Sequence, residues 1–166
     1  MGCARRDWRN NNFRAGFREH RCTGDPRMQD YPEKLTGGCL CGAVRFETTM
    51  KPFKVSYCHC ESCRKATAAP VLAILLFYEG GVRFTRGEPK RYESSPGVFR
   101  GHCSVCGSPL SWEGIWHDKP IIEVYVASLD DPEACSPDRH AFIDERLSWF
   151  DVADDLPRYS GTSPES

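Results

Sequence analysis

Short hydrophobic stretches separated by turns recur along the chain from about residue 35 onward. Residues 43–48 and 82–85 alternate hydrophobic and polar positions, which predicts strands with one buried face. Residues 71–78 form a continuous apolar run, typical of a strand buried on both faces. Further short strands are predicted at 54–57, 90–94, 98–102, 110–112, 121–127 and 139–143.

Glycine and proline divide these segments. Gly80-Gly81 and Pro96-Gly97 indicate turns, and Pro70 ends a stretch at 61–69 that is long enough for one or two helical turns. Many short strands with little helix predict a mainly β fold made of small antiparallel sheets.

The chain has 166 residues, which fits one domain. Residues 1–34 are rich in arginine and poor in aliphatic side chains, so we expect a disordered basic extension. The β domain is then expected over residues 35–159, and residues 160–166 are expected to form a flexible tail.

Charge and hydropathy exclude some classes of protein. The formal net charge is −1, which argues against nucleic acid as a partner. No apolar run approaches the roughly 18 residues of a membrane span, so no membrane association is expected. The N-terminus lacks the hydrophobic segment of a secretory signal, and we therefore expect a cytoplasmic protein.

The ten cysteines need an explanation in such a protein. Disulfides are rare in a reducing compartment, where clustered cysteines more often bind metal or react. Seven of the ten fall into three groups by spacing: Cys39 with Cys41, Cys58 with Cys60 and Cys63, and Cys103 with Cys106. The remaining three, Cys3, Cys22 and Cys135, stand alone.

A C-x-C pair and a C-x-x-C pair can converge to give four thiolate ligands. Cys39, Cys41, Cys103 and Cys106 would then hold a structural zinc that joins distant parts of the chain. The alternative is a redox dithiol at Cys103 and Cys106, but the helix start that usually accompanies such a motif is missing.

The triplet Cys58, Cys60 and Cys63 supplies only three thiolates. Catalytic zinc sites commonly have three protein ligands and a fourth position for water or substrate. Spacing alone leaves two alternatives open: an open site of this kind, or a closed site completed by a residue such as His59 or His102. Arg64 and Lys65 follow the triplet directly and could hold a substrate carboxylate or simply be solvated.

Three blocks of sequence resemble the signature of a known family. They are residues 37–46 (GGCLCGAVRF), 58–65 (CHCESCRK) and 103–110 (CSVCGSPL), and the ending at 149–157 is also similar. The family is that of the glutathione-dependent formaldehyde-activating enzymes, which includes centromere protein V.

The resemblance implies a tent of small antiparallel sheets with two zinc ions per chain. Cys39, Cys41, Cys103 and Cys106 would hold the structural zinc, and Cys58, Cys60 and Cys63 the zinc of the active site. The implied activity is a carbon–sulfur lyase reaction on a thiol adduct, typified by the addition of glutathione to formaldehyde.

Other residues could take part in such a reaction. His59 or His102 could move the proton, although a structural role is the simpler interpretation of each. Trp112, Trp149 and Phe150 could wall a substrate pocket, although core packing is the favoured role for each of them.

Two other classes of function fit the same pattern. A zinc-stapled domain of the centromere protein V type could be a binding module without catalysis. The triplet could also form a redox sensor that releases zinc on oxidation.

Overall fold

The computed structural model describes residues 31–164, so most of the expected N-terminal extension lies outside the described residues. One α-helix, α1 (Glu61–Thr67), and three short 3₁₀ helices accompany ten strands in this part of the chain. The strands are β1 (Thr36–Gly38), β2 (Arg45–Thr48), β3 (Lys54–Cys58), β4 (Leu72–Tyr78), β5 (Val82–Arg86), β6 (Lys90–Ser95), β7 (Val98–His102), β8 (Pro109–Trp116), β9 (Lys119–Tyr125) and β10 (His140–Ala141). The 3₁₀ helices are η2 (Val126–Ser128), η3 (Pro132–Ala134) and η4 (Ile143–Glu145).

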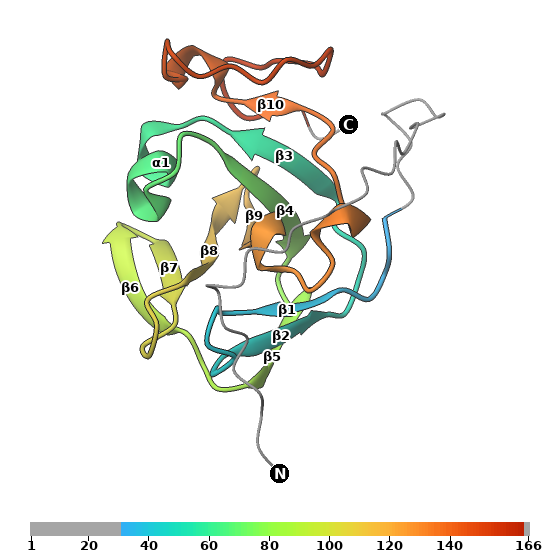
Figure 1. The fold of residues 1–166 in the computed structure, drawn as a ribbon, viewed down its shortest axis with the longest axis vertical. Helices are drawn as coiled ribbons and strands as arrows, with labels where there is room; N and C mark the ends of the chain where they lie inside the picture. Colours follow the sequence, from blue (N-terminus) through green and yellow to red (C-terminus); the bar gives the residue numbers. More distant parts are fainter. Residues whose placement is uncertain (1–30, 165–166) are drawn as a thin grey trace, which may run out of the picture.

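The strands form two sheets. A small sheet has the order β1-β2-β5, and a seven-stranded sheet has the order β10-β3-β4-β9-β8-β7-β6. All pairings are antiparallel except that of β10 with β3. Figure 1 shows the small sheet at one end of the molecule and β10 with the C-terminal segment at the other. The predicted mainly β fold is confirmed.

The large sheet buries side chains on both faces, as the apolar run at 71–78 predicted. On β4, Leu75 and Phe77 pack in a core with Phe46 of the small sheet. Ile74 and Leu76 point the other way, into a second core that also contains Trp116. Alternation along one strand therefore supplies two separate cores.

Packing extends beyond the range expected for the domain. Tyr31 is buried, and its hydroxyl donates a hydrogen bond of 3.1 Å to Asp138. At the other end Ser163 is buried, and the backbone N–H of Phe142 donates to the carbonyl of Gly161. The last described residues thus lie against the domain rather than apart from it.

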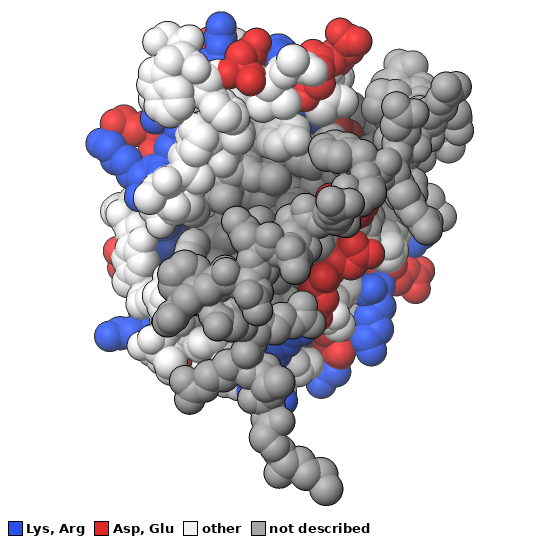
Figure 2. Space-filling model, in the orientation of Figure 1, with Lys and Arg blue, Asp and Glu red and all other residues white. Residues whose placement is uncertain are grey.

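Surface charges of the two signs are mixed. Figure 2 shows acidic and basic side chains interspersed around the margin of the described part of this face. Among the described residues, none of the helices has the length and apolar character that crossing a membrane requires.

The two-sided burial of β4 leads to a stability prediction. Leu75 is fully buried, so Leu75→Ala removes apolar contacts and leaves a cavity. We expect the free energy of unfolding to fall by about 2–5 kcal/mol, measured by urea denaturation. Ile115→Thr is the control, because Ile115 is 64% exposed and Thr keeps a β-branched side chain; a change within about 0.5 kcal/mol is expected. Equal losses in the two variants would contradict this account.

Candidate metal centres and binding pocket

Four cysteine sulfurs meet between the two sheets. Cys39 and Cys41 lie in the turn between β1 and β2, and Cys103 and Cys106 lie in the turn between β7 and β8. The sulfurs all lie within 4.8 Å of one another. The Sγ atoms of Cys39 and Cys41 are 3.5 Å apart, and those of Cys41 and Cys103 are 3.8 Å apart.

These distances fit a tetrahedral zinc site. Zinc–sulfur bonds of about 2.3 Å at tetrahedral angles place the sulfurs about 3.8 Å apart. Backbone N–H groups also point at sulfur: Val44 donates to Cys39 at 3.2 Å and Val105 donates to Cys103 at 3.4 Å. Donors of this kind stabilise thiolates, which are the form that binds metal.

A glycine with positive φ follows each of these cysteine pairs. The φ angles are 75° at Gly42 and 74° at Gly107. Any other residue would be strained there, because L side chains rarely adopt this conformation. The two glycines let both turns close tightly around the four sulfurs.

Three further sulfurs meet at the end of β3. Cys58 ends the strand, Cys60 is the N-cap of α1, and Cys63 lies within the helix. Their sulfurs also lie within 4.8 Å of one another, with 3.5 Å between Cys58 and Cys60. The Cys60 sulfur caps the helix by accepting from the backbone N–H of Cys63 at 3.3 Å.

Charge is shared unevenly among these three thiols. Hydrogen bonds from Cys58 and Cys63 hold the pKa of Cys60 far below its ordinary value. The hydrogen bond to Cys60 in turn raises the pKa of Cys58 far above its ordinary value. Sulfurs this close cannot all ionise unless a cation lies between them. The set of donors therefore fits a metal with an affinity for thiolate.

The three-cysteine cluster opens onto a pocket of about 310 Å³. Its walls are largely apolar and include Ile74, Leu76 and Trp116, together with all three cysteines. This volume lies at the lower end of the range for small-molecule sites. The four-cysteine cluster does not line this pocket.

Three charged side chains also line the pocket, and the sequence did not single them out. Lys54, Glu123 and Arg100 are 3%, 9% and 7% exposed. Strand register explains their meeting: Lys54 pairs with Leu76, Leu76 with Glu123, Glu123 with Trp112, and Trp112 with Arg100. We call this line of residues the cross-strand row. Charged and apolar members alternate along it on one face of the sheet.

Burial changes the protonation of the central member of this row. Desolvation, followed by the charge of Cys60, raises the pKa of Glu123 to about 8. Perturbed carboxyls in a pocket are characteristic of functional sites. The sequence did contain a signal, because Glu123 is the one charged residue within the apolar stretch 121–127.

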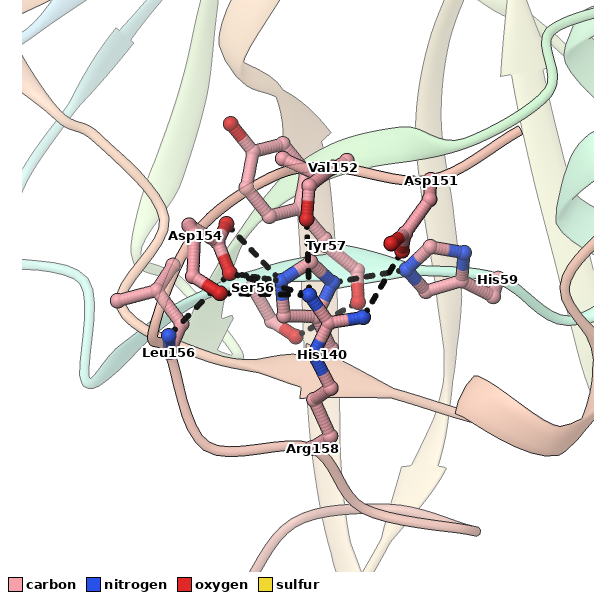
Figure 3. A network of polar contacts seen from close by, with 9 residues as sticks. All are labelled: Ser56, Tyr57, His59, His140, Asp151, Val152, Asp154, Leu156 and Arg158. Carbon is pink, nitrogen blue, oxygen red and sulfur yellow. Dashed lines mark hydrogen bonds and ion pairs between the residues drawn. The ribbon is translucent and has the colours of Figure 1, made fainter.

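A buried histidine pair lies behind the triplet, outside the residues that line the pocket. His59 Nε2 is 2.8 Å from His140 Nδ1, and His140 Nε2 is 3.0 Å from Asp154. An ionised carboxylate only accepts, so with a neutral His140 ring the Nε2–H donates to Asp154 and Nδ1 accepts from His59. Figure 3 shows Arg158 close to this pair, where its guanidinium donates a hydrogen bond to Asp151.

His59 is therefore a structural link between β3 and the C-terminal segment. Burial and then the neighbouring His140 lower the pKa of His59 to about 4. Its ring remains neutral near pH 7, and it lies apart from the pocket lining. His102, the other candidate for moving a proton, is also absent from that lining.

The basic residues after the triplet have partners on the protein. Arg64 donates to the carbonyls of His59 and Glu145, and Lys65 pairs with Glu61 at 2.7 Å. Neither lines the pocket. These contacts hold both side chains against the loop and the helix.

The three aromatic candidates for the pocket wall differ in their positions. Trp112 lines the pocket and also packs against the second core. Trp149 is 75% exposed and forms an edge-to-face pair with Phe150, and neither contributes to the lining.

Comparison with known proteins places this fold and site in a family. The family model described as "Glutathione-dependent formaldehyde-activating enzyme" matches residues 34–145, which is more than half of the chain. The chain belongs to this family. The match contains both cysteine clusters and all three charged members of the cross-strand row.

Individual relatives are more distant. A Halomonas elongata protein, provisionally named a glutathione-dependent formaldehyde-activating enzyme, is 27% identical over 129 residues, 71% of this chain and 80% of its own length. An uncharacterized lyase of Schizosaccharomyces pombe is 34% identical over 74 residues, which are 45% of this chain and 53% of that protein. A crystal structure of a Rhodobacter sphaeroides protein covers 58% of this chain and 88% of its own, with 21% identity and a TM-score of 0.48.

The histidine pair leads to a second stability prediction. Asp154→Ala removes the acceptor of the His140 Nε2–H and leaves that donor buried without a protein partner. We expect the free energy of unfolding to fall by about 1–3 kcal/mol. Asp155→Ala, at the exposed neighbouring position, should have little effect. Urea denaturation of both variants checks this, and an unchanged Asp154→Ala protein would refute the proposed link.

Proposed function

We propose that this chain is a zinc-dependent carbon–sulfur lyase that joins a thiol to formaldehyde and cleaves the product in reverse. The observation that carries the proposal is the position of Cys58, Cys60 and Cys63 on the wall of the pocket. Among the described residues, three ligand atoms gather there, whereas four gather at the other cluster. Family membership and the names of the relatives support a glutathione-related lyase.

In this proposal the seven cysteines have two roles. Cys39, Cys41, Cys103 and Cys106 hold a structural zinc that completes its tetrahedron with protein sulfur. Cys58, Cys60 and Cys63 hold a second zinc beside the pocket. When bound there, zinc supplies a Lewis acid that favours the thiolate form of a substrate thiol.

The reaction is an addition without net oxidation. A carbon–sulfur bond forms, the π bond of the carbonyl breaks, and the thiol proton ends on the new hydroxyl oxygen. Glutathione is the thiol that we propose, with S-hydroxymethylglutathione as the product. Glu123 is the carboxyl within the pocket lining, and we assign the transfer of this proton to it.

The apolar walls around the triplet keep bulk water away from the sulfur. Ile74, Leu76 and Trp116 contribute to these walls. Exclusion of water strengthens electrostatic interactions at the reacting centre and limits competing hydrolysis. A reducing compartment such as the cytoplasm would keep all seven thiols available for metal.

Metal content provides a direct test of the two roles. We expect two zinc ions per folded chain and one in Cys58→Ser, because a serine hydroxyl is a poor replacement for a thiolate ligand. Cys135→Ala is the matched control, because Cys135 is outside both clusters and should leave two ions. Elemental analysis of protein purified without oxygen measures this. A Cys58→Ser protein that still holds two ions would contradict the catalytic site.

Activity provides a separate test. We expect zinc-loaded protein to accelerate exchange between free formaldehyde and S-hydroxymethylglutathione, followed by NMR with ¹³C-formaldehyde. Cys58→Ser should reduce the accelerated rate by at least about 100-fold, and Cys135→Ala should preserve it. If wild-type protein with two ions gives only the uncatalysed rate, the lyase proposal fails and the binding module becomes the better account.

A further inference from the structure

Arg100 is a buried cation whose side chain is not fully satisfied by the protein. It lies on β7 and is 7% exposed. Its Nη1 atom is buried and has no hydrogen-bond partner among the described residues. No carboxylate of the described residues forms an ion pair with it, since Glu123 lies two strands away in the cross-strand row. Burying a guanidinium in this way costs stability unless a partner is supplied.

The place of Arg100 ties it to the reaction site. It lines the same pocket as Cys58, Cys60 and Cys63. Arg100 is therefore on the wall that a molecule in this pocket would contact, beside the three cysteines.

Lys54 offers a useful contrast at the other end of the row. Its Nζ donates to the carbonyls of Ser163 and Pro164 and lies 4.3 Å from the centre of the Trp116 ring. The protein thus satisfies the buried charge of Lys54 with its own groups. At Arg100, in contrast, the buried Nη1 atom has no hydrogen-bond partner among the described residues.

Two roles could explain a cation beside the triplet. In the first role, Arg100 serves solely to offset the net negative charge of three thiolates and one divalent ion. Alternatively, its planar fork could bind an oxygen of the substrate, for which a guanidinium is better suited than an ammonium. Two observations together favour the second role: Nη1 has no hydrogen-bond partner among the described residues, and Arg100 lines the pocket, whereas charge compensation by itself requires neither.

We propose that Arg100 is a substrate-binding residue that receives a negatively charged oxygen of the thiol substrate or its adduct. This assignment rests on the proposed function for the identity of the reaction, but binding can be measured without turnover. The oxygen has two possible sources: a carboxylate of the thiol compound, or the oxygen of the carbonyl that the sulfur attacks. The substrate class is then a thiol whose adduct presents anionic oxygen close to sulfur.

Binding of unreactive probes tests the carboxylate source. Zinc-loaded wild type, Arg100→Met and Arg100→Lys are titrated calorimetrically with S-methylglutathione and with its diethyl ester. If the oxygen belongs to a carboxylate, Arg100→Met lowers the affinity for S-methylglutathione about 10- to 100-fold. It also abolishes the preference for the free acid over the diethyl ester. Arg100→Lys should recover only part of the affinity, since an ammonium lacks the fork.

Turnover tests the carbonyl source. If the oxygen derives from the carbonyl, S-methylglutathione affinity is unchanged in Arg100→Met. The value of kcat/KM for formaldehyde then falls about 10- to 100-fold with both glutathione and 2-mercaptoethanol, which lacks a carboxylate. Arg86→Met, at an exposed position at the end of β5, is the control and should change neither measurement.

Zinc content of every variant identifies the competing role. Arg100→Met and Arg100→Lys proteins that retain two ions with unchanged affinity and unchanged kcat/KM would overturn the proposal. So would loss of zinc in Arg100→Met accompanied by full affinity and rate in Arg100→Lys, since any cation would then suffice. If wild type binds S-methylglutathione through Arg100 but never forms the hydroxymethyl product, the assignment of Arg100 holds and the lyase reaction is the part that fails.

Discussion

Repulsion between neighbouring sulfurs is the constraint on which both cysteine clusters depend. Sulfur atoms 3.5–3.8 Å apart cannot all ionise in a buried setting unless a cation balances them. The four-cysteine cluster has tight turns at Gly42 and Gly107 and backbone N–H groups that point at sulfur, and both features favour thiolates around a cation. Because one turn belongs to the small sheet and the other to the large sheet, a metal at the four-cysteine cluster would join the two.

The pocket differs from an ordinary core, because it contains buried ionisable side chains where a core would have apolar ones. Lys54, Glu123 and Arg100 occupy alternate places in the cross-strand row, with Leu76 and Trp112 between them. Hydrophobic side chains of similar size would give a more stable sheet. Three buried ionisable side chains beside the triplet therefore indicate a site shaped for chemistry or binding, and the separate core on the other face maintains stability.

Local patterns predicted the strands with a clear period, but β1 was not predicted, and β8 extends well beyond the predicted 110–112. The alternation at 82–85 and the apolar run at 71–78 correspond closely to β5 and β4. Cysteine spacing likewise grouped sulfurs that lie together in the structure. Short loops set the distances within each pair and within the triplet, whereas the two pairs of the four-cysteine cluster meet only because the two sheets pack together. Arg100 and Glu123 could not be found in this way, because their meeting depends on the register of β7, β8 and β9 across the sheet. The same holds for His140 and Asp154, which reach His59 only through the parallel pairing of β10 with β3.

Alternate side chains of strand β3 lie in two different environments. Lys54, Ser56 and Cys58 face the pocket, while Tyr57 stacks on His140 behind it. Side chains alternate with a period of two, so a single inserted or deleted residue between Lys54 and Cys58 would exchange the two faces. The cysteine would then point toward the histidines and an aromatic ring would occupy the pocket. The length of this five-residue strand is thus as firmly constrained as the identity of the ligands at its end.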